Sequence, residues 1–372
     1  MPVVLHWFLP TTGDSRSIVG VDDRGGHSTH TSPTETPYRA PDLDYLVDVA
    51  RAAERNGFTG VLTPTGTWCE DAWLTTAAIA QHTRTLRFLV AFRPGSLSPT
   101  LAAQMAATFQ RISGGRLMLN IVTGSDAAEQ QRFGDWLDKD ERYARTGEFL
   151  SVLRGAWDGP FDYEGEHYRV AGALAPRAFT PPPIYFGGSS PAALDVAAEH
   201  TDVYLTWGEP PAAVASKIAA VRERAARPIR FGIRLHVITR DTAEEAWAVA
   251  GSLLDALTPE QIAKAQSSLR QADSVGQQRM LALHGGKLDA LEIYPNLWAG
   301  VGLVRPGAGT ALVGSHTEVA DRIAEYHELG IDEFILSGYP HLEEACHAGE
   351  GLIPELRRRH LLLPAGSTHE PS

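Results

Sequence analysis

The sequence predicts an α/β protein folded as a (β/α)8 TIM barrel. The first observation is the order of its segments, because eight short apolar runs alternate with segments of helical periodicity along most of the chain. Such alternation is typical of βα units around a parallel sheet. The second is composition: 372 residues, 43% hydrophobic and 21% charged, can bury one large core. Eight repeats are the number that closes a barrel of this kind.

The individual elements follow from local patterns. Strands are expected where β-branched, aromatic and other apolar residues cluster: 3–9, 60–65, 87–93, 116–123, 184–188, 203–207, 229–238 and 333–338. Helices are expected where apolar residues recur every three to four positions: 42–57, 71–83, 98–112, 141–157, 190–199, 211–226, 241–257, 317–329 and 342–356. All of these are assigned to a single domain, 1–361, followed by a tail at 362–372 that is expected to be disordered.

Two segments interrupt the alternation. Residues 13–40 are rich in Gly, Ser, Thr and Pro, which predicts a long loop after the first strand. Residues 258–315 separate the seventh repeat from the last helix–strand pair; within them, 258–297 has a helical pattern and 298–315 is rich in glycine. We interpret both segments as insertions on the barrel rather than as further domains.

Charge and cysteine content exclude several classes of protein. The formal net charge of −12 and the pI near 5.6 disfavour nucleic acid or an anionic membrane as the main partner. Two cysteines are too few for a disulfide framework and suit a reducing compartment. With no recognisable leader and no apolar run of ~18 residues, a cytoplasmic location is expected. Neither a zinc-binding histidine pair nor a serine nucleophile motif is found, so no metal is expected.

The stretch "FGIRLHVI" carries two basic residues on one face of a predicted strand. Ile233, Leu235 and Val237 share the other, apolar face, because side chains alternate along a strand. Arg234 and His236 would therefore project into the barrel near its C-terminal mouth, where the active sites of such barrels lie. An unpaired buried guanidinium is costly, so it either binds an anion or belongs to an internal ion pair, and spacing alone favours neither.

Other polar and aromatic groups follow predicted strands at the same end of the barrel. They are Cys69, Trp207, Tyr339 and His341. Individually each is explained by packing or by a loop position. In "YFGGSSPAAL", a strand ends in two glycines and two serines before a helix, so Ser189 and Ser190 could hold a phosphate at a helix N-terminus. Simple N-capping by serine is the alternative.

The chain resembles the alkanesulfonate monooxygenases of the bacterial luciferase-like superfamily. The resemblance extends from about residue 3 to 356 and rests on "GVLTPTGTWCEDAW", "RFLVAFRPGSLSPTLAAQMAATF", "YLTWGEPP", "RFGIRLHVI", "NLWAGVGLVRPGAGTALVG" and "LSGYPHLEEA". It implies a two-component enzyme. A separate NAD(P)H-dependent reductase would supply reduced FMN, which with O₂ oxygenates the carbon bearing a sulfonate and releases aldehyde and sulfite. Assembly as a homodimer or homotetramer is expected.

The resemblance also implies site residues. Those expected to line the flavin and sulfonate site are Arg234, His236, Tyr339, His341, Arg305, Trp207 and Cys69. The two arginines would neutralise anionic charge, while the histidines and the tyrosine would donate hydrogen bonds. Those expected to contact the cofactor are Ala91, Asn120, Thr123, Tyr143, Ser189 and Ser190. Arg305 lies in the glycine-rich segment, which predicts a lid that carries this arginine into the site when reduced flavin binds.

One position departs from the family pattern. Thr12 stands where the family usually has a histidine after the first strand, so the identity of the sulfonate stays open between a simple alkyl chain and a bulkier group such as a sulfosugar. Three alternatives remain: a related monooxygenase with another substrate such as a sulfone, a deazaflavin-dependent oxidoreductase, and a non-catalytic flavin-binding protein.

Overall fold

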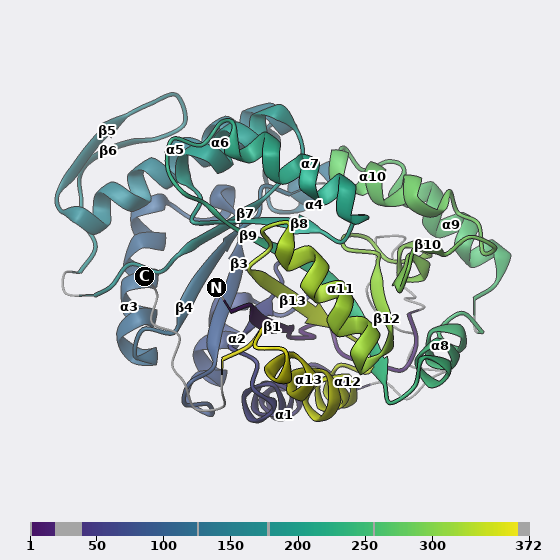
Figure 1. The fold of residues 1–372 in the computed structure, drawn as a ribbon. Coiled ribbons are helices and arrows are strands. Elements are labelled where there is room, and N and C mark those ends of the chain that lie inside the picture. The colour runs from purple at the N-terminus through teal and green to yellow at the C-terminus, as the bar shows by residue number, and fades with distance from the viewer. Residues whose placement is uncertain (1, 19–38, 125, 177–178, 256, 364–372) are drawn as a thin grey trace.

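A closed barrel of eight parallel strands forms the centre of the molecule (Figure 1). The computed structural model describes residues 2–18, 39–124, 126–176, 179–255 and 257–363. The strands are β1 (Val4–Phe8), β2 (Gly60–Thr63), β3 (Arg87–Phe92), β4 (Leu117–Ile121), β7 (Ile184–Gly187), β8 (Val203–Trp207), β9 (Arg230–Arg240) and β13 (Glu333–Ser337). β13 pairs with both β9 and β1, and β9 pairs with β8, which closes the ring. The predicted (β/α)8 fold is confirmed.

Helices surround the barrel and cover its apolar outer face (Figure 1). They are α1 (Leu43–Asn56), α2 (Ala72–Ile79), α3 (Pro99–Ser113), α5 (Lys139–Asp158), α6 (Pro191–His200), α7 (Pro211–Arg222), α11 (His316–Glu328), α12 (His341–His347) and α13 (Ile353–Arg358), the last two joined by η3 (Ala348–Leu352). Their starts follow the sequence: Asp42 caps α1 by accepting from Tyr45 N, and Gly57 ends it with φ 96°.

Alternation along the strands separates the helix-facing core from the barrel interior. In β3, Phe88 and Val90 pack in the outer core, whereas Leu89 joins an interior apolar layer. That layer also contains Leu62, Met118, Tyr185, Val203 and Ile335. In β9, Ile233 and Leu235 likewise face the helices. The residues between them on β9 therefore point into the barrel, as the sequence predicted.

A buried polar network closes the N-terminal end of the barrel. Glu333 Oε2 lies 3.0 Å from His6 Nε2 and accepts a hydrogen bond of 2.7 Å from Tyr185 OH. Arg230 NH1 donates to Glu333 Oε1 at 2.6 Å. Glu333 and His6 are each 1% exposed, so this end of the barrel is sealed by paired charges.

The chain between β9 and β13 forms an extension beside the barrel. Its helices are α8 (Ala243–Ser252), α9 (Pro259–Leu269) and α10 (Val275–His284). The prediction of helix over 258–297 is wrong at its end, because β10 (Glu292–Tyr294) and β11 (Leu297–Trp298) form a hairpin. Pro295 and Asn296 make its turn, and Asn296 has a φ of 61°. This Pro-Asn pair between short apolar runs is the turn signal that the helical interpretation overlooked.

The glycine-rich segment contributes a strand to the main sheet. β12 (Ala311–Ser315) runs parallel to the second half of β9, from His236 to Arg240. Between β11 and β12 lie a short helix, η2 (Gly300–Leu303), and the turn that carries Arg305. The expected loop at 298–315 is therefore restricted to 299–310.

Four further short elements complete the described chain. The antiparallel pair β5 (Phe161–Glu164) and β6 (Arg169–Ala173), the short helix α4 (Ala127–Arg132) and the turn η1 (Pro94–Ser96) were not predicted. Most of the expected loop 13–40 and of the tail 362–372 lies outside the described residues. No helix of the described chain has the length and apolar character needed to cross a bilayer.

Candidate active site

A cavity of about 460 Å³ opens at the C-terminal ends of the barrel strands. A volume of this size lies within the range of roughly 300–1,000 Å³ common for small-molecule sites. Of the predicted residues, eleven line it: Arg234, His236, Tyr339, His341, Arg305, Trp207, Asn120, Thr123, Tyr143, Ser189 and Ser190. Thr12, at the position of the family histidine, lines it as well. The structure thus brings most of the predicted site together from six strands and the 299–310 segment.

Arg234 projects from β9 into this cavity without a carboxylate partner among the described residues. Its NH1 donates to Leu235 O at 2.8 Å, and its guanidinium lies over the Phe8 ring, 4.7 Å from the centroid. Burial lowers the pKa of Arg234 to about 10. The arginine stays protonated at neutral pH, so an uncompensated positive charge faces the cavity.

His236, two residues further along β9, is neutral at neutral pH. Burial is the largest cause that lowers its pKa well below the ordinary value, followed by the charges of Arg234, His341 and Arg305. Its Nδ1 lies 2.7 Å from Ser337 Oγ, and the Ala308 backbone accepts a hydrogen bond from the ring. The imidazole therefore joins β13 to the segment that carries Arg305.

Tyr339 lies at the centre of an aromatic and cationic cluster. Its ring stacks on His236 at 5.4 Å between centroids and meets His341 edge-on at 5.2 Å. The guanidinium of Arg305 lies over the same ring at 5.3 Å. Two histidines and one arginine thus contact the ring of a single tyrosine, on its face or at its edge.

Arg305 is buried at the cavity wall. It is 5% exposed, and its Nε donates to Ile18 O at 2.8 Å. Like Arg234, it has no carboxylate partner within the described part of the chain. This position rules out a solvent-facing arginine on a surface loop, and the movement of the segment with flavin binding stays a prediction.

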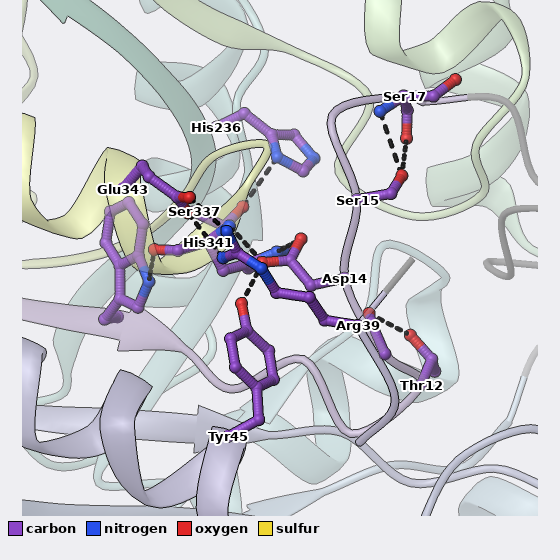
Figure 2. A network of polar contacts seen from close by, with 12 residues as sticks. Thr12, Asp14, Ser15, Ser17, Arg39, Tyr45, His236, Ser337, His341 and Glu343 are labelled. Carbon is purple, nitrogen blue, oxygen red and sulfur yellow. Dashed lines mark hydrogen bonds and ion pairs between the residues drawn. The ribbon is translucent and has the colours of Figure 1, made fainter. Parts of the chain in front are cut away.

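His341 is held by a carboxylate that the sequence analysis did not single out. Asp14 Oδ1 lies 2.9 Å from His341 Nδ1, and Asp14 Oδ2 accepts from His341 N at 2.7 Å and from Tyr45 OH (Figure 2). Burial alone would raise the pKa of Asp14, but these donors hold it below its ordinary value. Asp14 follows β1 in "PTTGD", where only its place in the polar loop was noted.

The segment after β7, which is the predicted phosphate cradle, contains two glycines at close approaches to neighbouring residues. A Cβ at Gly187 would meet Leu205 O at 2.7 Å, and one at Gly188 would meet Ala193 Cβ at 2.5 Å, so both positions require glycine. Ser190 Oγ caps α6 by accepting from Ala193 N at 3.3 Å. Ser189 lines the cavity without an α6 capping bond. The capping alternative therefore applies to Ser190, and Ser189 is the serine left for a ligand.

Trp207 packs against helix α10 of the extension, and both line the cavity. A Cβ at Gly276, in the first turn of α10, would lie 3.1 Å from Trp207 Cζ3. The absence of a side chain at Gly276 lets the helix pack on the indole, and Met280 of the same helix also lines the cavity. The extension thereby forms one wall of the site.

Two predicted residues do not reach the cavity. Cys69 Sγ lies within hydrogen-bonding distance of the carbonyls of Pro64 (3.7 Å) and Gly66 (3.6 Å). Burial raises the pKa of this thiol to about 12, so it is not a thiolate at neutral pH. Ala91 is buried in β3 opposite Asn120, which does line the cavity.

The cavity also contains charged groups that sequence reasoning missed. Arg93 donates to Glu129 at 2.7 Å, and Lys217 lies 2.7 Å from Glu209 and donates to Thr206 Oγ1. Glu209 also accepts from Arg279, so these cations all have a carboxylate partner, in contrast to Arg234 and Arg305. Within the described residues no group of three or more His, Cys, Asp or Glu side chains is arranged to hold a metal ion.

Comparison with known proteins agrees with this architecture. The family described as Luciferase-like monooxygenase matches residues 19–333. Among solved structures, a riboflavin lyase with modified FMN and riboflavin is 20% identical (TM-score 0.78; 98% of this chain, 93% of that one). A long-chain alkane monooxygenase is 19% identical, with a TM-score of 0.78 over 99% of this chain and 94% of that one. An EDTA monooxygenase from Chelativorans sp. BNC1 is 20% identical, with a TM-score of 0.74 over 98% of this chain and 95% of that one. The family match spans most of the sequence, and the chain belongs to the luciferase-like monooxygenase family.

Proposed function

We propose that this protein is a two-component, FMN-dependent monooxygenase that desulfonates an organosulfonate to an aldehyde and sulfite. The observation that carries the proposal is the pair Arg234 and Arg305, which line one cavity with no carboxylate partner among the described residues. A compact substrate anion would satisfy both. A neutral alkane or sulfone would leave both charges unpaired, at a cost of several kcal/mol.

The cavity fits a flavin phosphate on its opposite side. Gly187 and Gly188 let backbone approach closely, and Ser189 offers a hydroxyl beside the N-terminus of α6. Tyr143 and Asn120 line the same cavity. Reduced FMN, when bound, supplies the electrons, and O₂ supplies the oxygen atom that is added to the carbon bearing the sulfonate.

Three side chains bind and orient the substrate: Arg234 of β9, Arg305 of the 299–310 segment and Tyr339 after β13. Arg234 and Arg305 hold the sulfonate by charge-assisted hydrogen bonds, which burial strengthens. Tyr339 stacks on His236 and lies under Arg305. Its hydroxyl donates a hydrogen bond to an anionic oxygen of the ligand that the arginines hold. Neutral His236 keeps this arrangement rigid through Ser337 and Ala308.

The enzyme works with a separate NAD(P)H-dependent reductase that delivers reduced FMN. Purified protein is therefore expected to be colourless, because a co-substrate flavin dissociates. Retention of stoichiometric oxidised FMN without turnover would instead favour the non-catalytic flavin-binding alternative. A deazaflavin-dependent oxidoreductase would transfer hydride without using oxygen.

Sulfite release tests the proposal. The protein is incubated with FMN, NADH, a flavin reductase and a panel of linear, aromatic and sugar sulfonates, in air and without oxygen. Oxygen-dependent sulfite and aldehyde from at least one sulfonate are expected, with none when the reductase is omitted. Oxygen-independent turnover, or oxidation of uncharged substrates alone, would contradict the proposal.

A further inference from the structure

We propose that Asp14 is a positioning residue that fixes His341 as its Nδ1–H tautomer, so that Nε2 presents a lone pair to the cavity. The inference concerns a residue outside the predicted site, and its consequence for turnover rests on the proposed function. It also revises the role implied by the resemblance, in which His341 donates a hydrogen bond.

The proton assignment follows from the three contacts of Asp14. Its carboxylate receives the backbone N–H of His341 at 2.7 Å and the hydroxyl of Tyr45, and it lies 2.9 Å from His341 Nδ1. The side chain of Asp14 is 0% exposed, and the group is ionised at neutral pH because its pKa is lowered. An ionised carboxylate only accepts hydrogen bonds. The proton between the two groups therefore resides on Nδ1.

The remaining contacts fix the orientation of the imidazole ring. Phe8 lies 5.6 Å from it between centroids and Tyr339 lies 5.2 Å away, edge-on. His341 is 4% exposed and lines the cavity. With Nδ1 turned toward Asp14, Nε2 is the ring nitrogen left for the cavity, where it accepts a hydrogen bond from a ligand when the ring is neutral.

Asp14 is itself fixed by the chain around it. Its backbone exchanges two hydrogen bonds with Arg39, Asp14 N to Arg39 O at 2.9 Å and Arg39 N to Asp14 O at 2.8 Å. The Arg39 guanidinium forms a bidentate pair with Glu343, two residues after His341 (Figure 2). This arrangement attaches both Asp14 and Arg39 to the start of α12, so the backbone of Asp14 is held in place beside His341.

An acceptor at Nε2 constrains how the substrate lies. Sulfonate oxygens are acceptors too, so they belong beside Arg234 and Arg305, while His341 faces a part of the substrate that carries hydrogen. The carbon that loses a hydrogen in the proposed reaction is such a part. Nε2 is the proton-accepting atom at this wall of the cavity.

Nitrogen NMR on protein labelled with ¹⁵N-histidine tests the tautomer directly, with the His341 signals identified by their loss in His341→Gln. At a pH where the ring is neutral, we expect Nδ1 to show the protonated, pyrrole-type signal and Nε2 the unprotonated, pyridine-type signal. In Asp14→Asn the amide donates to Nδ1, and the two signals should exchange. The matched control Tyr45→Phe keeps the Asp14–His341 pair and should leave them in place. A pyridine-type Nδ1 in the parent protein would overturn the proposal, even if Asp14→Asn does not fold.

Kinetics provide the second measurement. Removal of a group that orients a functional histidine typically costs roughly 10–100-fold, so Asp14→Asn should lower kcat for sulfite release by that factor. The affinity for reduced FMN should be unchanged, since Asp14 is placed against His341 rather than the β7 cradle. Unchanged kcat alongside an exchanged tautomer would show that the tautomer has no role in turnover. Absence of sulfite release from any sulfonate would contradict the proposed function while leaving the NMR assignment intact.

Discussion

Two arginines on the same face of β9 have opposite surroundings. Arg230, at the N-terminal end of the barrel, donates to Glu333 at 2.6 Å in a network with His6 and Tyr185. Arg234, four residues further along the strand, also lies near a histidine and a tyrosine, but no carboxylate within the described residues pairs with it. The same residue types thus form a complete network at one end of the barrel and an incomplete one at the other.

The difference separates a structural charge from one that awaits a ligand. A carboxylate at the N-terminal end compensates the arginine within the fold, so nothing more is needed there. At the C-terminal end no carboxylate among the described residues compensates Arg234, and under the proposed function the anion arrives with the substrate in the cavity of about 460 Å³. The charges at the two ends of one strand therefore favour the C-terminal end as the ligand-binding end, independently of any relative.

Arg234→Ala should have the largest effect on activity. Loss of one buried charge-assisted contact in the transition state costs about 2–4 kcal/mol, or roughly two to three decades in the rate of sulfite release. Thermal unfolding should stay close to that of the parent, because no carboxylate among the described residues loses its partner. Marked unfolding at 25 °C would make Arg234 a structural residue like Arg230 and remove the contrast between them.

Arg305→Ala should have the next largest effect on activity. A hydrogen bond to a charged group contributes about 1.5–3 kcal/mol, so turnover should fall roughly 10–100-fold while reduced FMN still binds. The measurement is steady-state sulfite release together with an anaerobic flavin titration. Equal loss of flavin binding and turnover would move Arg305 from the sulfonate to the cofactor.

Glu333→Gln should affect stability but leave sulfite release unchanged. Burial would raise the pKa of Glu333, but His6, Arg230 and Tyr185 hold it below the ordinary value. A lowered folded-state pKa means that the ionised carboxylate stabilises the protein above the unfolded pKa of ~4.3 and loses this effect as pH falls through the folded value. We expect the variant to lose about 1–3 kcal/mol at pH 7, less in acid, in urea unfolding at several pH values. A loss independent of pH would contradict the assignment of an ionised Glu333.

Ser189→Ala should have the smallest effect. Its hydroxyl would contribute about 1 kcal/mol to phosphate binding, so affinity for reduced FMN should fall roughly fivefold with no change in stability. Ser190→Ala is the contrasting variant, because removal of an N-cap costs about 1 kcal/mol of folding free energy. Unchanged FMN affinity in Ser189→Ala would place the phosphate elsewhere.

The barrel was predictable because its strands are short, apolar and regularly followed by helices. The period-2 pattern of β9 correctly placed Arg234 and His236 on the interior face, opposite Ile233 and Leu235. The β10–β11 hairpin was missed because its strands have three and two residues, too few for a periodic signal. Its burial depends on pairing with β12, a contact between distant residues that local pattern does not encode.

The site residues also divide into those that local sequence pattern predicts and those that depend on distant contacts. Those at or just after strand ends, such as Trp207 and Tyr339, were correctly placed at the cavity, because a barrel brings all strand ends together. Asp14 was not found, since its contact with His341 joins positions 327 residues apart and no local motif marks it. Cys69 was assigned from its place after a predicted strand and from the resemblance, but its thiol lies beside the carbonyls of Pro64 and Gly66 and does not line the cavity.

The claim that Arg234 awaits an anion is tested most directly by anaerobic titration calorimetry with reduced FMN present. An alkanesulfonate and the methyl sulfone of the same chain length are compared on the parent, Arg234→Ala and Arg230→Gln. We predict that the parent prefers the sulfonate by about tenfold or more, equivalent to about 1.4 kcal/mol. Arg230→Gln should keep this preference and Arg234→Ala should lose it. Equal binding of the two ligands by the parent, or a preference that survives Arg234→Ala, would contradict the account.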